Sequence, residues 1–342
     1  MLAAIRERYG VPGDVVELRE LPIPTPAADE LLVRVHAASI NRADLDLLYP
    51  RPAFARVFLG VRSPRVQRVG CDVAGVVEAV GRDVTRFRPG DRVFADLYPF
   101  GLGGFGEYVA APARAFLAIP EGMATEDAAT FPHAAILAIQ GLRRRDGRAP
   151  DPGDRVLVDG ASGNVGPFAV RIAKALGAHV TGTASPAKLE FVRSLGADRV
   201  LDYTTTDYTR MGERYDWILD VDSHHPILDA RRAVKRGGAY VTLGGATRRL
   251  VGAIAGGPVI SRATGRQMGL MLWWRPFHAP DVARLAELHA EGSVRPVIDR
   301  RYRLADVVEA LRYVDEGRAR GKVVIRAIDE GPNGPSAADE SP

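Results

Sequence analysis

The clearest chemical signal in the sequence is a glycine-rich segment at 160–166, with Gly160, Gly163 and Gly166. It follows a strand-like apolar run at 155–159 and begins a run with apolar residues at helical spacing. Glycines in this setting allow a tight turn, the approach of backbone N–H groups to a pyrophosphate, and close packing of a helix on a strand. Because the helix N-terminus adds a partial positive charge, the segment predicts a dinucleotide site rather than a purely structural turn. The residues expected to bind the dinucleotide here are Ser162, Gly163, Asn164 and Val165.

A hydroxyl and a cation follow the next strand-like run, which begins at Ala178. Dinucleotide folds that bind NAD(H) place an acidic residue about 20 residues after the glycines, where it contacts the ribose 2′-hydroxyl. Here the run leads into Ser185 and Lys188, and the first acid is Glu190. Because a hydroxyl and an ammonium suit a 2′-phosphate, the sequence predicts NADPH as the cofactor.

Two patterns of secondary structure must position these residues. To about residue 119, strand-like runs alternate with Gly- and Pro-containing turns, which is typical of a β-barrel or sandwich. From about residue 123, short apolar strands alternate with amphipathic helices, which predicts right-handed βαβ units and a parallel sheet. The chain returns to strand–helix–strand after Ser293. The last segment, 329–342, is rich in Pro, Gly, Ser and acids and is predicted to be disordered.

Length and composition exclude several classes of protein. The 342 residues suit about two domains, and 46% hydrophobic with 26% charged residues is an ordinary globular balance. The single cysteine, Cys71, excludes a disulfide framework and a four-cysteine zinc site. The longest uncharged stretch, 128–142, is too short to cross a membrane, and Arg6 leaves no room for a signal peptide, so a cytoplasmic location is expected. The densest basic run, 143–145, has no interleaved aromatics, so nucleic-acid binding is not expected.

Seven stretches carry a family resemblance, namely 38–44, 70–81, 89–94, 104–109, 160–166, 195–203 and 321–325. On these motifs the chain resembles the medium-chain dehydrogenase/reductase superfamily, and within it the zinc-independent quinone oxidoreductase branch. The resemblance implies an α/β fold with a GroES-like, β-rich catalytic domain and a Rossmann coenzyme domain with a doubly wound parallel sheet. It implies a catalytic domain at 1–122 and 294–328 and an NADP(H)-binding domain at 123–293.

The resemblance also implies roles for individual residues. Asn41 would lie beside the nicotinamide. Many relatives carry a threonine that touches the nicotinamide where this chain has Leu137, so that contact is lost or replaced. The residues implied around the adenosine phosphate are Ser185, Lys188 and Tyr203, and those implied near the ribose are Leu243, Gly244 and Gly245.

Zinc-dependent relatives hold a catalytic metal with three protein ligands. At those three places this chain has Asn41, Cys71 and His133, and Asp72 is a fourth group close by in the sequence. An amide oxygen is a poor zinc ligand, so we predict no metal. Cys71 is then interpreted as a small buried hydrophobe and His133 as a hydrogen-bonded pocket residue. Without a Lewis acid, reduction of a polarised double bond is favoured over oxidation of an alcohol.

The expected reaction is hydride transfer from C4 of NADPH to the β-carbon of an enone or to a quinone. Asn41 and Tyr49 are the predicted catalytic donors to the developing oxygen anion, with a structural loop tyrosine as an equal alternative for Tyr49. His224 and His225 follow a strand end, where they could contact the substrate or be ordinary loop histidines. Lys322, in the terminal Gly-Lys turn, is expected to be structural.

Other interpretations stay open at the level of the sequence. A carbonyl or alcohol dehydrogenase of a biosynthetic pathway, or a redox-silent NADPH-binding protein, would share the cofactor site. The apolar run 267–274 is predicted to be the edge strand of the coenzyme sheet. Because relatives of this type commonly join such edges, a homodimer is expected. Trp273 and Trp274 could instead flank a substrate lid at 250–260.

Overall fold

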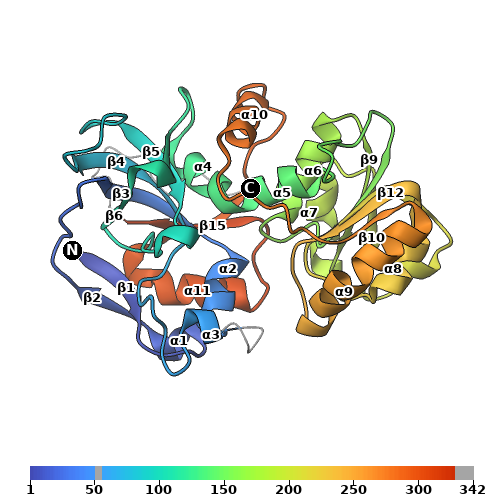
Figure 1. Cartoon of the computed structure of the whole chain (residues 1–342), viewed down its shortest axis with the longest axis horizontal. Coiled ribbons are helices and arrows are strands. Elements are labelled where there is room, and N and C mark those ends of the chain that lie inside the picture. The colour runs from blue at the N-terminus through green and yellow to red at the C-terminus, as the bar shows by residue number, and fades with distance from the viewer. Residues whose placement is uncertain (51–55, 328–342) are drawn as a thin grey trace.

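The computed structural model describes residues 1–50 and 56–327. The tail predicted at 329–342 lies outside the described residues. A β-rich half with the N-terminus and a half built on a parallel sheet lie side by side, with helices α4 (Thr125–Thr130) and α5 (Ile136–Gly141) between them (Figure 1). Within the described ranges, no helix is long and apolar enough to cross a membrane. The cytoplasmic location stays a prediction.

The β-rich half contains strands from both ends of the described chain. Its strands are β1 (Leu2–Arg6), β2 (Val16–Glu20), β3 (Glu30–Ile40), β4 (Asp72–Val80), β5 (Arg92–Asp96), β6 (Tyr108–Pro112), β7 (Phe116–Ala118), β14 (Ile298–Arg303) and β15 (Lys322–Arg326). Its helices are α1 (Pro12–Val15), α2 (Arg42–Leu48), α3 (Arg56–Leu59) and α11 (Val307–Asp315). Strands β1 and β2 form an antiparallel pair, and the other seven form one sheet in the order β14-β15-β3-β4-β5-β7, with β6 paired to β3.

Strand β3 is the centre of this sheet, because three strands pair with it. Strand β6 pairs with its first half and β15 with its second half, while β4 runs along its length. Gly75 breaks the β-branched run of β4 for a steric reason. A Cβ atom at this position would lie 2.1 Å from the carbonyl oxygen of Arg34, so only glycine allows the two strands to approach this closely.

The other half is a six-stranded parallel sheet in the order β10-β9-β8-β11-β12-β13. Its strands are β8 (Arg155–Asp159), β9 (His179–Ala184), β10 (Arg199–Asp202), β11 (Tyr215–Asp220), β12 (Val234–Thr242) and β13 (Gln267–Leu270). Its helices are α6 (Gly166–Ala175), α7 (Leu189–Ser194), α8 (Ile227–Ala233), α9 (Thr247–Thr264) and α10 (Ala279–Ala290). The strand order reverses between β8 and β11, as in doubly wound dinucleotide folds. The predicted fold class is therefore confirmed.

We propose the predicted division of the chain into domains. All strands of the seven-stranded sheet lie within 1–122 and 294–328, and all strands of the parallel sheet lie within 123–293.

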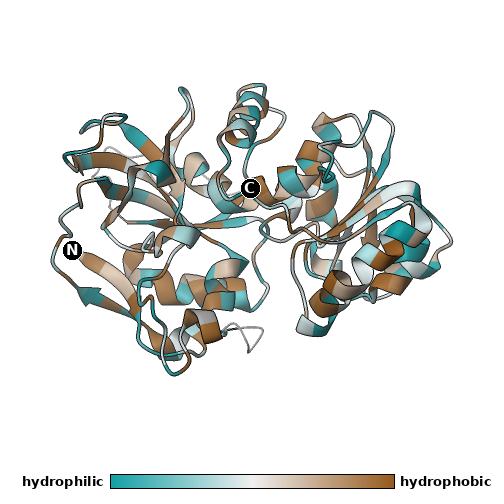
Figure 2. Cartoon of the chain, viewed as in Figure 1, coloured by the Kyte–Doolittle hydropathy of each residue, from teal (hydrophilic) through white to brown (hydrophobic). Residues whose placement is uncertain are grey.

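The region after β12 differs from the sequence prediction in the length of its edge strand. The segment 250–260, considered as a substrate lid, lies inside helix α9 (Figure 2 shows hydrophobic residues along this helix). The run 267–274 contains a strand of only four residues, β13, which is the edge strand as expected. The residues after β13 leave the sheet and carry Trp273 and Trp274 into packing against the core of α4 and α5.

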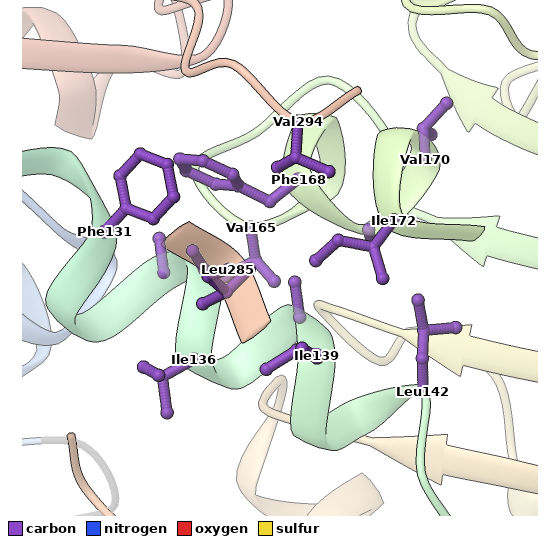
Figure 3. Packing of buried hydrophobic residues seen from close by; sticks show 14 of the residues in the cluster. Phe131, Ile136, Ile139, Leu142, Val165, Phe168, Val170, Ile172, Leu285 and Val294 are labelled. Carbon is purple, nitrogen blue, oxygen red and sulfur yellow. The ribbon is translucent and has the colours of Figure 1, made fainter. Parts of the chain in front are cut away.

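Helices α4 and α5 are packed into the largest hydrophobic cluster, which includes residues of both sheets. In Figure 3, Phe131 and Ile139 face Phe168 and Ile172 of helix α6, and Leu285 of helix α10 lies beside them. The rings of Phe131 and Phe168 meet edge to face, with centroids 5.3 Å apart. This packing fixes the turn between α4 and α5 relative to both sheets.

Candidate active site

Polar side chains stand at the same end of four adjacent strands of the seven-stranded sheet. Ser39 of β3 is paired with Asp72 of β4, which is paired with Asp96 of β5. Lys322 is the first residue of β15, and Asn41 directly follows β3. All five side chains are buried, so their polar atoms need partners within the protein or a ligand. We call these five residues the strand-end cluster.

Hydrogen bonds hold the amide of Asn41 in the middle of this cluster. The ammonium of Lys322 donates to Asn41 Oδ1 at 2.7 Å and lies 3.5 Å from Asp72 Oδ2. Asn41 Nδ2 and the hydroxyl of Ser39 each donate to the same oxygen of Asp72 at 2.8 Å. The other oxygen of Asp72 is buried without a hydrogen-bond partner among the described residues. The amide is therefore oriented by a cation at its oxygen and by a carboxylate at its nitrogen.

Burial governs the protonation of the charged pair in the cluster. Burial raises the pKa of Asp72 to about 6, while Lys322 lowers it and Asp96 raises it further. Burial also lowers the pKa of Lys322, against the negative charges of Asp72 and Asp44. At neutral pH Asp72 is therefore mostly ionised and acts as the counter-ion of a buried ammonium.

The first turn of α2 holds the backbone of Asn41. Asn41 is the N-cap of this helix, and Asp44 Oδ2 accepts from its backbone N–H at 2.8 Å. Asp44 Oδ1 accepts from the backbone N–H of Cys71 at 2.9 Å. Burial and the nearby carboxylates raise the pKa of the Cys71 thiol well above its usual range, so the thiol is neutral. Sequence reasoning missed Asp44, although its place three residues after an N-cap asparagine is a capping-box signal.

His133 lies in a π-helical turn, Phe131–Ala135, between α4 and α5. Such turns are rare and often occur at functional sites. His133 Nδ1 lies 2.9 Å from Asp96 Oδ2, so the histidine is bonded to the strand-end cluster. Burial lowers the pKa of His133, but the charge and hydrogen bond of Asp96, with help from Asp72, outweigh burial and raise it.

The glycine-rich segment reaches from the parallel sheet to the strand-end cluster. Asn164 Nδ2 donates to the carbonyl of Ile40 at 3.3 Å. The backbone N–H of Gly321 donates to the carbonyl of Ser162, also at 3.3 Å. Because Ile40 and Gly321 directly precede the asparagine and lysine of the cluster, the segment and the cluster are immediate neighbours.

The residues expected around the adenosine phosphate lie at the ends of β9 and β10. Ser185 directly follows β9, and Tyr203, which is 57% exposed, directly follows the neighbouring strand β10. Lys188 has partners that the sequence did not predict. Its ammonium donates to the carbonyls of Gly317 at 2.7 Å and Ala319 at 2.6 Å. Lys188 therefore links the two halves of the protein, and its binding of a 2′-phosphate stays a prediction.

The residues expected near the ribose, Leu243 to Gly245, follow β12 and are tied to the end of β11. The backbone N–H of Ser223 donates to Gly244 O at 3.0 Å. A Cβ atom at Gly245 would lie 2.5 Å from the backbone nitrogen of Ser223, so this close approach requires glycine. The nearby His224 lies 3.6 Å from Asp222. No ligand role for His224 follows from this contact.

Comparisons with known proteins agree with this architecture. Two family models match, an alcohol dehydrogenase GroES-like domain at 27–121 and a zinc-binding dehydrogenase at 195–325. The mouse mitochondrial NAD(P)H oxidoreductase RTN4IP1 is 32% identical over 88% of this chain and 82% of its own length. The chloroplastic quinone-oxidoreductase QR1 of Triphysaria versicolor is 30% identical over 95% of this chain and 98% of its own. The solved quinone oxidoreductase of Coxiella burnetii has a TM-score of 0.82 and 26% identity, covering 96% and 99% of the two chains.

The chain belongs to the medium-chain dehydrogenase/reductases. The predicted resemblance to their quinone oxidoreductase-like members is confirmed. The protein is accordingly an NAD(P)H-dependent oxidoreductase.

The residues at the zinc positions of this medium-chain dehydrogenase/reductase do not fit a catalytic zinc. Asn41 presents an amide whose oxygen already accepts from the ammonium of Lys322. Across residues 1–50 and 56–327, no three His, Cys, Asp or Glu side chains are grouped as metal ligands. The matched zinc-binding dehydrogenase region, 195–325, contains none of the three positions. These residues therefore do not support a metal-dependent step.

Two other sequence-predicted residues have contacts with groups outside the strand-end cluster. Tyr49 is the C-cap of α2, and its hydroxyl donates to the carboxylate of Asp315 in α11. This hydrogen bond favours the structural alternative for Tyr49, whose catalytic role stays a prediction. Leu137 packs against the hydrophobic cluster around α5.

Sequence reasoning missed Asp220, the last residue of β11. Its side chain is buried, and Tyr240 donates to Asp220 Oδ2 at 2.6 Å. Burial and the charge of Asp159 raise the pKa of Asp220 to about 8, so this carboxyl is mostly protonated at neutral pH. The available signal was its place at the carboxyl end of a parallel strand, where ligands of such sheets bind.

Proposed function

We propose that this medium-chain dehydrogenase/reductase uses NADPH to reduce a quinone or an α,β-unsaturated carbonyl compound without a metal. The observation that carries the proposal is the ammonium of Lys322 held on the amide of Asn41, next to the dinucleotide segment. When bound, NADPH supplies the hydride. Reduction of either substrate develops negative charge on an oxygen, and a positively polarised amide N–H stabilises such charge.

The same proposal assigns the cofactor contacts. The backbone N–H groups at the start of α6 bind the pyrophosphate, since they lack partners within the helix. The proposed pyrophosphate contacts are Ser162, Gly163, Asn164 and Val165, and the proposed ribose contacts are Leu243, Gly244 and Gly245. Asn41 orients the nicotinamide. It donates to the substrate oxygen with the amide hydrogen that does not bond Asp72, in place of the long 3.5 Å contact with the carbonyl of Ser39.

The proposed reaction is tested by mixing the NADPH complex with a panel of quinones, enones and ketones in a stopped-flow instrument. We expect NADPH oxidation by 9,10-phenanthrenequinone or by an enone, with no loss of rate after incubation with EDTA. Elemental analysis is expected to find less than about 0.1 zinc per chain, because a thiol, an amide and one imidazole make a weak zinc site. One zinc per chain, or oxidation by ketones alone, would contradict the proposal.

The preference for NADPH is tested by Lys188→Ala. Charge-assisted hydrogen bonds from Lys188 and Ser185 to a 2′-phosphate contribute about 1.5–3 kcal/mol each when desolvated and under about 1 when exposed. We therefore expect wild type to prefer NADPH over NADH by roughly 10- to 1,000-fold in Kd. The variant should bind NADPH more weakly and NADH about equally, and high salt should reduce the difference.

A matched control for this experiment is Lys174→Ala. Lys174 is also a half-buried lysine of the parallel-sheet half, but its ammonium pairs with Asp198 at 2.8 Å. Its removal should leave the Kd of both cofactors unchanged. If wild type binds NADH and NADPH equally, or if Lys188→Ala weakens the binding of both equally, the absence of an acidic residue after β9 does not indicate a preference for NADPH.

We further propose a homodimer formed through the edge strand β13. Beside this strand, helix α9 exposes apolar side chains, with Val251 at 54%, Ile254 at 48% and Val259 at 68%. An open edge flanked by apolar residues is a pairing surface. Light scattering at micromolar concentration should give twice the chain mass of 36.9 kDa, and Val259→Asp should lower it. A wild-type mass of one chain would refute the dimer.

A further inference from the structure

Three aromatic rings pack together next to the strand-end cluster. The ring centroid of His133 lies 5.8 Å from that of Tyr98 and 5.6 Å from that of Trp274. The rings of Tyr98 and Trp274 are 6.1 Å apart. Tyr98 is 39% exposed whereas His133 is 8% exposed, so this ring cluster extends from solvent to a buried imidazole. Aromatic faces of this kind suit a flat, unsaturated ligand.

Two ring nitrogens of the ring cluster have no hydrogen-bond partner among the described residues. Trp274 Nε1 is buried and has no hydrogen-bond partner within the described part of the chain. His133 uses Nδ1 for Asp96, and among the described residues no group is hydrogen-bonded to its Nε2. Because buried polar groups nearly always have partners, the buried indole N–H of Trp274 beside the unbonded Nε2 of His133 indicates that a ligand supplies the acceptor.

The loop that carries Trp274 is held in a strained conformation. Phe277 has a φ of +47°, in the left-handed region that bulky residues rarely adopt. Its ring packs edge to face on Phe94 of β5, with centroids 4.9 Å apart. A strained backbone conformation of this kind persists only where packing of the surrounding residues holds it, and such conformations are concentrated at ligand-binding sites.

We propose that His133, oriented by Asp96, is the acid that protonates the substrate oxygen during reduction, with the rings of Tyr98 and Trp274 holding the substrate against it. This inference rests on the proposed function and extends it to a catalytic residue. For a quinone, hydride transfer delivers two electrons and leaves negative charge on an oxygen. The N–H bond at His133 Nε2 breaks as the O–H bond forms. The products are a hydroquinone, NADP⁺ and a neutral imidazole, which regains its proton from solvent.

Negative groups face the imidazole from several elements, which favours its protonated form. They are Asp96 of β5, Asp72 of β4 and Asp44 of α2, and the other titratable groups nearby are Cys71, Tyr98 and Lys322. The proton donor is therefore present at low pH and persists to higher pH than in an ordinary histidine. It is lost as the pH rises through the raised pKa of His133, so kcat should be level at low pH and fall toward high pH.

The test is the pH profile of kcat for His133→Asn, with saturating NADPH and the quinone or enone that wild type reduces. Asparagine keeps a donor near the position of Nδ1 for Asp96 but has no group at Nε2. We expect kcat to fall about 100- to 10,000-fold, the fall toward high pH to disappear, and the Kd of NADPH to stay the same. Asp96→Asn should keep the fall with pH but move it to lower pH, because the main charge that raises the pKa of His133 is gone.

The matched control is His289→Asn. His289 also pairs with an aspartate, Asp127 at 3.3 Å, and its ring meets Phe131 at 5.7 Å, but it lies outside the strand-end and ring clusters. It should retain the kcat and pH profile of wild type. If His133→Asn unfolds, His133→Gln replaces it, judged by circular dichroism and NADPH binding.

Two results separate this proposal from the proposed function. A kcat of the His133 variant within about threefold of wild type, with the same fall toward high pH, would overturn the role of His133 while leaving the proposed reaction intact. Wild type that reduces no quinone or enone would overturn both.

Discussion

Replacing Lys322 with methionine is expected to lower the free energy of unfolding by about 3–5 kcal/mol at pH 8. Methionine is nearly as long as lysine but carries no charge, so the carboxylate of Asp72 keeps its burial and loses its cation. The oxygen of the Asn41 amide loses its donor as well. Urea unfolding followed by tryptophan fluorescence measures the effect.

The loss of stability should grow with pH. The pKa of Asp72 is about 6 in the folded protein and has an ordinary value of 3.8. Between these values the folded protein binds a proton that the unfolded chain has released. The resulting stability is present at low pH and is lost as the pH rises through 6. Without Lys322 the pKa of Asp72 rises further, so this loss continues to higher pH. Wild type and variant should therefore differ least at pH 5, where only the lost hydrogen bond to Asn41 separates them, and most at pH 8.

Two further variants make this prediction specific. Adding Asp72→Asn to Lys322→Met removes the unpaired carboxylate and should restore most of the lost stability at pH 8. Lys235→Met removes a closer pair, with Asp216 at 2.7 Å, but these side chains are 42% and 25% exposed. Its removal should cost at most about 1 kcal/mol. Equal losses for the two lysines, or a loss independent of pH, would show that Asp72 and Lys322 do not act as a buried ion pair.

The architecture of the coenzyme half could be predicted from the sequence because each βαβ unit is local. Strand β8, the glycine segment and helix α6 follow one another directly in the chain, so a short stretch of sequence contains the pattern of all three. The π-turn that carries His133 could not be predicted in this way. It lies between a helix opening at Thr125 and a helix-like stretch that follows Pro132, and it is fixed by the packing of Phe131 on Phe168.

The candidate site also has a part formed by residues close in sequence and a part formed by residues far apart in sequence. The dinucleotide segment could be predicted, since its chemistry lies within seven consecutive positions. The strand-end cluster could not, because Lys322 and Asn41 are 281 residues apart and meet only through the pairing of β15 with β3. The contact of Lys188 with Gly317 is hidden for the same reason, since 129 residues separate them. The family's Gly-Lys turn therefore suggested a structural lysine at 322, and residue type suggested a phosphate-binding lysine at 188.

Two glycines of the dinucleotide segment are expected to respond differently to alanine. A Cβ atom at Gly166 would lie 2.3 Å from the carbonyl oxygen of Gly160 and 2.4 Å from the carbonyl carbon of Ala161. Both contacts are with backbone atoms, so the turn must move, and Gly166→Ala should cost about 1–3 kcal/mol of stability or more. At Gly163 the nearest atom, Gly160 O, is 3.9 Å away. Alanine therefore fits there when no cofactor is bound.

Gly163→Ala should consequently leave the free energy of unfolding within about 0.5 kcal/mol of wild type. It should nevertheless weaken NADPH binding by roughly 100-fold, about 2.7 kcal/mol, because its methyl group occupies space that the pyrophosphate needs. Adenosine 2′-monophosphate has no pyrophosphate, so wild type and this variant should bind it equally in calorimetric titrations. Gly166→Ala should instead lower both stability and NADPH affinity. If Gly163→Ala binds NADPH as wild type does, the pyrophosphate does not lie against this turn, and the cofactor contacts proposed from 162–165 are wrong.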